Sequence, residues 1–189
     1  FNMRRLATKK FPPDTLIVDV DGAYVMPSFI DTHLHGIGGW GTEDCEASSI
    51  LNMSERLADF GVSAFMPTVY TDKLDVMIAS TRAIVEAMGK EKGAKIMGVN
   101  LEGPFISMER VGAQNPEGVL PVDLDVFEQL IKAGEGKIIC MTVAPELKGM
   151  RELALLARRE GITLLAGHTD ATYENIIEDD FIEPIAQEE

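Results

Sequence analysis

Three polar stretches of the sequence carry residue types that bind metal ions and activate water. The first contains His33 and His35, two residues apart and directly after the apolar pair Phe29-Ile30. In an extended strand, side chains at positions i and i+2 point to the same face, so both imidazoles can face one ion. The pair alone is a moderate signal, because two histidines also meet by chance on exposed turns.

Glu102 and His168 each follow a further apolar run. A carboxylate at the end of a buried strand must be paired, metal-bound or solvated, because burying an isolated charge is costly. His168 follows the run 164–167, and Thr169 or Asp170 is expected to cap the next helix. Taken singly, a solvated Glu102 and a structural His168 are the simpler interpretations.

The elements that must position these residues form a βα alternation. From about Thr15 onward, short apolar runs alternate with segments whose apolar residues recur every three or four positions, which predicts a parallel sheet covered by helices. Each helix is expected to end at a glycine of positive φ. The predicted strands are 26–32, 62–70, 95–101, 137–143 and 162–166, and the predicted terminal glycines are Gly61, Gly89, Gly134 and Gly161.

All three histidines and Glu102 therefore follow predicted strands, at the face where barrel enzymes place their active sites. Four candidate metal ligands, His33, His35, Glu102 and His168, are expected to converge there. Nitrogen and carboxylate ligands favour divalent zinc, with iron, manganese or cobalt as alternatives. An open coordination position would lower the pKa of a bound water and supply hydroxide for hydrolysis.

Longer motifs around these residues resemble the amidohydrolase superfamily. The stretch 27–36, Pro-Ser-Phe-Ile-Asp-Thr-His-Leu-His-Gly, is similar to the first-strand signature of that superfamily. Within this superfamily, further stretches of the chain resemble the N-acetylglucosamine-6-phosphate deacetylases. They occur in the same order along the chain as in that family. These stretches are 101–105, 112–116, 142–146 and 166–172, and the resemblance covers roughly residues 25–177.

The resemblance implies an α/β fold, a (β/α)8 barrel of the TIM type with a small accessory β domain, of which about five βα units are displayed. It implies that Glu102 and His168 bind the main metal ion and that His33 and His35 build a second metal position. Ala113 and Gln114 stand where the family has a small residue and a histidine that contacts sugar phosphate or metal, so both are predicted to bind substrate. Gln114 is a departure, because an amide cannot exchange a proton near neutral pH as imidazole can.

The implied reaction removes the acetyl group from N-acetylglucosamine 6-phosphate and yields glucosamine 6-phosphate and acetate, a step of amino-sugar catabolism. The small-molecule partner is then a sugar phosphate, and a homodimer is expected. The family's catalytic aspartate, a further metal-binding histidine and a phosphate-binding arginine are not found after Ile177. The catalytic residue is therefore expected outside the displayed sequence.

Two alternatives stay open. Another amidohydrolase, such as a dihydroorotase-like or deaminase-like enzyme, would share His33 and His35 but not the stretches 101–105 and 112–116. A metal-free sugar-phosphate binder, or a catalytically inactive homologue, would account for Gln114.

Composition excludes other classes. The 189 residues include 17 basic and 31 acidic side chains, a net charge of -14, which argues against nucleic acid or an anionic membrane as partner. No stretch approaches the roughly 20 apolar residues of a membrane span, so a cytoplasmic protein is expected. Cys45 and Cys140 are expected as separate thiols rather than a disulfide.

The chain is expected to divide into three parts. Residues 1–25 would belong to the accessory β domain, with a hairpin around Asp21-Gly22, and residues 26–178 would form the metal-dependent hydrolase barrel. Residues 179–189 form an acidic stretch broken by Pro184, which we assign to neither part and expect to follow a gap in the chain. Because eight βα units need about 250 residues, the barrel is expected to be incomplete.

Overall fold

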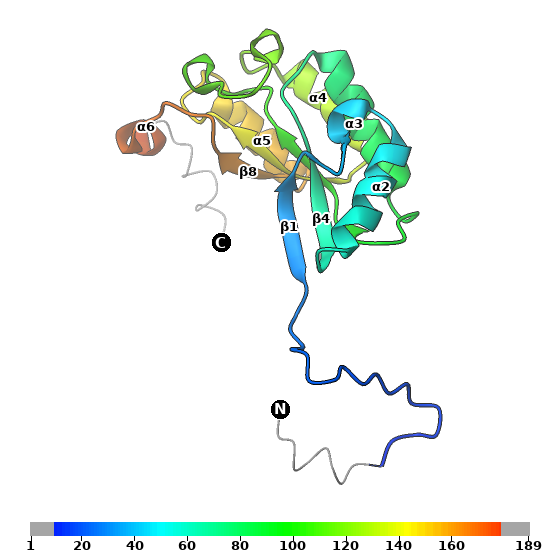
Figure 1. The fold of residues 1–189 in the computed structure, drawn as a ribbon. Coiled ribbons are helices and arrows are strands. Elements are labelled where there is room, and N and C mark those ends of the chain that lie inside the picture. Colours follow the sequence, from blue (N-terminus) through cyan, green and yellow to red (C-terminus); the bar gives the residue numbers. More distant parts are fainter. Residues whose placement is uncertain (1–9, 179–189) are drawn as a thin grey trace.

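The computed structural model of the chain describes residues 10–178, which fold around one curled parallel sheet. Its strands are ordered β1-β4-β6-β7-β8, with β5 pairing to β4, and every pair in this sheet is parallel. Figure 1 shows the helices α2, α3, α4 and α5 on one side of the sheet. The strands of the sheet are β1 (Phe29–Leu34), β4 (Val62–Val69), β5 (Lys95–Ile96), β6 (Val99–Glu102), β7 (Ile138–Val143) and β8 (Thr163–Ala166), and the helices are α2 (Ala47–Ala58), α3 (Leu74–Ala87), α4 (Leu124–Gly134), α5 (Met150–Arg159) and α6 (Tyr173–Glu178).

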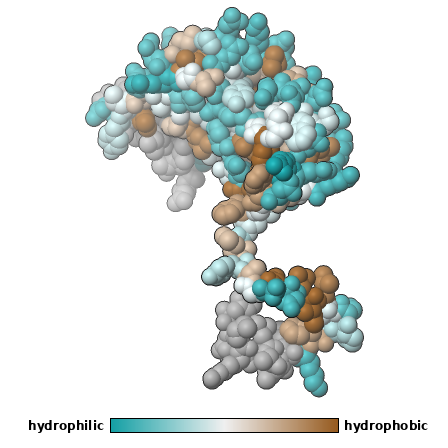
Figure 2. Space-filling model, viewed as in Figure 1, coloured by the Kyte–Doolittle hydropathy of each residue, from teal (hydrophilic) through white to brown (hydrophobic). Residues whose placement is uncertain are grey.

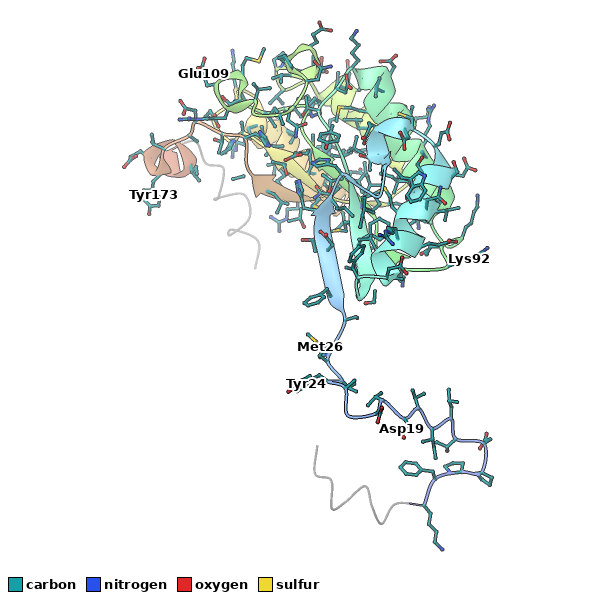
Figure 3. The ribbon with its side chains drawn as sticks, in the orientation of Figure 1. Asp19, Tyr24, Met26, Lys92, Glu109 and Tyr173 are labelled. Atoms are coloured by element: carbon teal, nitrogen blue, oxygen red, sulfur yellow. The ribbon has the colours of Figure 1, made fainter. Side chains whose placement is uncertain are left out.

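The loops at the carboxyl ends of the strands contain short elements of their own. A small antiparallel pair, β2 (Gly36–Ile37) and β3 (Trp40–Gly41), follows β1. The single turns η1 (Thr42–Asp44), η2 (Met108–Arg110) and η3 (Pro116–Gly118) lie in the loops after β3 and β6. Figure 3 shows Glu109, on the loop after β6, and Tyr173, on α6, on the same side of the molecule.

The hydrophobic core lies between the sheet and its helices. Phe65 of β4, Leu101 of β6 and Met141 of β7 are fully buried against it, as are Met77 of α3 and Phe127 of α4. The helices therefore close this side of the sheet. Full burial of one such side chain stabilises the fold by about 1.5 to 3 kcal/mol. A half-barrel of parallel strands with outer helices confirms the predicted α/β fold of the TIM-barrel type, displayed in part.

Each predicted strand overlaps an observed one, but the first, predicted over 26–32, begins only at Phe29, and the run 95–101 is interrupted. The run 95–101 divides into β5 and β6 because Gly98, at φ +157°, turns the backbone between them. A Cβ at this position would overlap the side chain of Ile139 on the neighbouring strand. Only glycine allows the two backbones to approach so closely.

Three of the four predicted helix ends are correct. Gly61, Gly89 and Gly161 have φ values of +77°, +79° and +72°. Gly134 was expected to play the same part, but it is the last residue of α4, and the left-handed conformation falls on Glu135 and on Gly136. Without a Cβ, Gly134 leaves room for the side chain of Ile138.

The predicted hairpin around Asp21-Gly22 is wrong within the described residues. The Ala23 N–H donates to the Val20 carbonyl at 2.9 Å, which makes a turn, but residues 10–28 contain no strand. An isolated two-stranded hairpin is marginal in water, and this segment extends away from the sheet in Figure 1, with Tyr24 and Met26 marked in Figure 3. Its apolar residues, Ile17 among them, are exposed, as Figure 2 shows. The assignment of residues 1–25 to an accessory domain stays a prediction, and residues 1–9 and 179–189 lie outside the described part.

Cys45 and Cys140 are both free thiols, as predicted. Among residues 10–178, no helix has the length and apolar content needed to cross a membrane.

Candidate metal centre

Four side chains from the carboxyl ends of three strands meet at one point. His33 lies in β1 with His35 just beyond it, Glu102 ends β6, and His168 follows β8. The Glu102 carboxylate lies between the imidazoles, with Oε1 2.9 Å from His168 Nε2 and Oε2 2.9 Å from His35 Nε2. His33 Nε2 is 3.5 Å from Oε1. The strands β1 and β8 are not neighbours, so it is the curl of the sheet that brings their histidines to one carboxylate.

This donor set fits a divalent metal ion. One ligand atom each from His33, His35 and Glu102 lies within 4.8 Å of the other two, which suits coordination of one ion. His168 faces the other side of the same carboxylate, through Oε1. Imidazole nitrogens with a carboxylate are typical ligands of zinc and of other transition metals. The ligand atoms of His33, His35 and Glu102 are therefore close enough together to hold one ion.

Glu102 is ionised in this setting. Glu102 is 6% exposed, and this burial raises the pKa of its carboxyl. Hydrogen bonds from His35 and His168, together with the charge of His33, outweigh that effect and hold the pKa at about 2. A buried carboxylate keeps its charge only where such partners compensate for lost solvation. The group is thus ready to act as an anionic ligand.

Two imidazoles are oriented by backbone carbonyls. His35 Nδ1 lies 2.9 Å from the Thr68 carbonyl, and His168 Nδ1 lies 2.9 Å from the Arg110 carbonyl. A carbonyl can only accept, so each Nδ1 carries a proton when these bonds form. Nε2 of each ring is then the nitrogen turned toward Glu102: it donates to the carboxylate in this structure, and it would bind a metal ion only after losing that proton. The ring of His35 also stacks on Tyr70, with centroids 3.6 Å apart and planes 10° apart. Such fixed rings are typical of metal-binding histidines.

The backbone of His168 is held in a conformation that non-glycine residues seldom adopt, at φ +49°. The Ser107 N–H donates to the His168 carbonyl at 2.8 Å, and the Asp170 N–H donates to Glu146 Oε1 at 2.8 Å. Glu146 Oε2 also accepts from Thr169 Oγ1 at 2.6 Å. The loops that follow β6 and β7 thus fix the segment that carries His168.

Asp170 does not cap α6, contrary to our expectation, because that helix begins only at Tyr173. Instead Asp170 Oδ1 accepts from Arg110 Nε at 2.8 Å, in a surface ion pair. Arg110 therefore contacts His168 through its carbonyl and Asp170 through its guanidinium. Sequence reasoning missed Glu146, whose one signal was its position in the stretch 142–146.

The two predicted substrate-binding residues lie in different surroundings. Gln114 is buried, and its Nε2 donates to Glu102 Oε2 at 2.6 Å while its Oε1 accepts from the Thr71 N–H at 2.8 Å. Ala113 lines a neighbouring cavity of about 250 Å³ together with Tyr70 and Asp72. Sequence reasoning missed Tyr70 and Thr71, although both lie directly after β4 at the same end of the sheet.

A half-barrel with histidines and a carboxylate at the carboxyl ends of its strands is the arrangement expected of a metal-binding barrel protein. The profile of the amidohydrolase family matches residues 24–185, and the chain belongs to this family. Amidohydrolases are generally metal-dependent, in agreement with the His and Glu group described above.

The similar proteins carry more specific names. The chain is 35% identical over 151 residues to the N-acetylglucosamine-6-phosphate deacetylase of Bacillus subtilis (strain 168), covering 78% of this chain and 38% of that protein. It is 26% identical over 164 residues to the N-acetylgalactosamine-6-phosphate deacetylase of Escherichia coli O157:H7, covering 86% and 44%. The crystal structure of the N-acetyl-D-glucosamine-6-phosphate deacetylase from Mycobacterium smegmatis matches with a TM-score of 0.78 at 26% identity, over 88% of this chain and 43% of that one. The chain thus spans about two fifths of the length of these relatives.

Proposed function

We propose that this chain is the metal-binding part of an enzyme that removes the acetyl group from N-acetylglucosamine 6-phosphate, giving glucosamine 6-phosphate and acetate. The observation that carries the proposal is the meeting of three imidazoles on the Glu102 carboxylate, within a chain similar to deacetylases of this name. A metal-free sugar-phosphate binder would have no need of three imidazoles facing one buried anion. A sugar phosphate is accordingly the proposed substrate.

The roles proposed for the residues follow from their geometry. Glu102 and His168 would hold the main metal ion, and His33 and His35 would hold a second ion that shares Glu102, with zinc as the proposed metal. Metal bound here would polarise the acetamide carbonyl and lower the pKa of a water molecule. Glu102 keeps its negative charge, and the Thr68 and Arg110 carbonyls hold Nδ1 of His35 and His168 so that Nε2 of each faces the centre.

The proposal is tested by assaying the natural protein for acetate release from N-acetylglucosamine 6-phosphate and from its galactosamine epimer. We expect Glu102→Gln and His168→Ala to lower kcat/KM by at least about 100-fold and to lower the zinc content, because each removes a ligand. Ser54→Ala is a matched control: Ser54 is buried and donates to the Ala94 carbonyl at 2.8 Å, away from the site. Full activity in both ligand variants, or no acetate release from either sugar by the wild type, would refute the proposal.

A further inference from the structure

The side chain of Gln114 joins the end of β4 to the central carboxylate of the site. Its Oε1 accepts from the Thr71 N–H at 2.8 Å, and its Nε2 donates to Glu102 Oε2 at 2.6 Å. The backbone agrees with this connection, because the Asn115 N–H donates to the Thr71 carbonyl at 3.2 Å. The loop after β6 is therefore tied to Thr71, just beyond β4, through Gln114 and through Asn115.

The orientation of this amide is determined by its partners. The Thr71 N–H is a donor only, so it must face the amide oxygen, and the amide NH2 must then face Glu102. The ionised Glu102 carboxylate is an acceptor only, which independently requires the same orientation. Both ends of the amide are used in this way, and the Gln114 residue is 6% exposed. Little of the group is left to contact a substrate that arrives from solvent.

We propose that Gln114 is a positioning residue that fixes the rotation of the Glu102 carboxylate, and not a residue that binds substrate. The two carboxylate oxygens have different partners, since Oε2 faces His35 and Gln114 whereas Oε1 faces His168 and His33. Gln114 is the one of these four partners whose side chain carries no charge at any pH, and it donates from a loop anchored on Thr71. With Gln114 in place, each oxygen is directed to its own set of imidazoles.

The consequence is a defined effect on metal binding. Without the donor at Oε2, the carboxylate would be free to rotate away from the position in which it serves both sets of imidazoles. Loss of a hydrogen bond to a metal-binding carboxylate commonly weakens metal binding by about 10- to 100-fold. The inference rests on one part of the proposed function, the assignment of Glu102 as a metal ligand. It does not depend on the identity of the substrate.

The test compares zinc affinity in variants of the natural protein, measured by competition with a chelator. Gln114→Met keeps the approximate volume and removes both hydrogen bonds, so we expect zinc binding about 10- to 100-fold weaker than in the wild type. Gln114→His restores a donor toward Glu102, and we expect it to recover zinc affinity to within about threefold of the wild type. Ser54→Ala, which removes a buried hydrogen-bonding group at the other end of the sheet, should leave zinc affinity unchanged.

A second measurement keeps the wild-type Gln114, so it does not depend on whether a Gln114 variant folds. In the wild type, the Gln114 side-chain amide protons should exchange slowly with solvent in nuclear magnetic resonance spectra, and Glu102→Gln should shift their signals. Unchanged zinc affinity in Gln114→Met together with a raised KM would overturn the inference, because that pattern belongs to a substrate-binding residue. Rapid exchange of the amide protons in the wild type would overturn it as well. Failure to release acetate would count against the proposed function alone, since zinc affinity is measured without substrate.

Discussion

At the scale of single residues, one carboxylate organises the site. Glu102 is the only acidic side chain among the described residues that contacts all three histidines, and they reach it from both edges of the sheet. Its burial would favour the neutral acid, yet the imidazoles stabilise the ionised form more strongly. The negative charge of Glu102 thus depends on groups that approach it only when the barrel strands are assembled.

The lowered pKa of Glu102 predicts a pH dependence of stability in the metal-free protein. The pKa is about 2 in the fold against an ordinary value of 4.5, so the ionised carboxylate stabilises the fold above about pH 4.5. That contribution is lost as the pH falls from 4.5 toward 2. We expect the difference in unfolding free energy between wild type and Glu102→Gln to be larger at pH 6 than at pH 3, measured by urea unfolding with a chelator present. A difference that grows on acidification would contradict the assignment.

At the scale of elements, the turns after the strands determine where the ligands lie. Gly103 directly follows Glu102 and has φ +92°, and a Cβ there would overlap Thr71 Oγ1, which donates to the Glu102 carbonyl at 2.6 Å. Gly61, at φ +77°, has no atom within 4 Å of the position of a Cβ. An alanine in place of Gly61 would therefore suffer backbone strain alone. An alanine in place of Gly103 would suffer both backbone strain and steric overlap with Thr71.

This pair gives a matched prediction. Gly61→Ala should cost about 1 to 3 kcal/mol of unfolding free energy, because alanine is strained at positive φ. Gly103→Ala should cost more than that and should also weaken zinc binding, because Thr71 and Glu102 must move apart. Urea unfolding and chelator competition measure the two effects. Equal costs with unchanged zinc affinity in both variants would show that the contact with Thr71 does not position Glu102.

The loop after β8 makes a second prediction at this scale. Glu146→Ala removes the acceptor of Thr169 Oγ1 and of the Asp170 N–H, so His168 should relax from its left-handed backbone. We expect zinc affinity to fall about 10-fold, measured by chelator competition. Glu117→Ala is the control, because Glu117 lies at the surface, where its Oε2 forms an exposed ion pair with Lys73 at 3.5 Å. An equal loss of affinity in both variants would show that the effect is a general one of lost negative charge.

The elements also show how far sequence reasoning reaches. The four candidate ligands follow apolar runs, and the polarity of parallel strands predicts that such residues meet at one edge, which the structure confirms. The bond from Thr71 to Gln114 joins residues 43 positions apart, and the bond from Asp170 to Glu146 joins residues 24 apart. These contacts depend on the path of irregular loops, for which the sequence has no periodicity. The prediction of a hairpin around Asp21-Gly22 is wrong for another reason. Local turn signals do not supply the further strands that a stable β element needs.

At the scale of the whole molecule, the sheet is closed by helices on one side and open on the other. Thr32, Asn100 and Leu165 line a hollow of about 350 Å³ on the open side, and Leu165 is 41% exposed. Asn100 is almost fully buried, and its Oδ1 has no hydrogen-bond partner among the described residues. Buried acceptors are nearly always satisfied, so Asn100 Oδ1 is expected to accept a hydrogen bond if further strands cover the hollow.

Two leucines of similar exposure make this interpretation testable in the natural protein. Leu165 of β8 is 41% exposed toward the hollow, and Leu155 of α5 is 45% exposed on the helix surface. If further strands cover the hollow, Leu165→Asp buries an unpaired charge and should lower the unfolding free energy by about 3 to 5 kcal/mol. Leu155→Asp stays in water and should change it by less than about 1 kcal/mol. Urea unfolding measures both, and equal small effects would mean that the open side of the sheet faces solvent in the natural protein too.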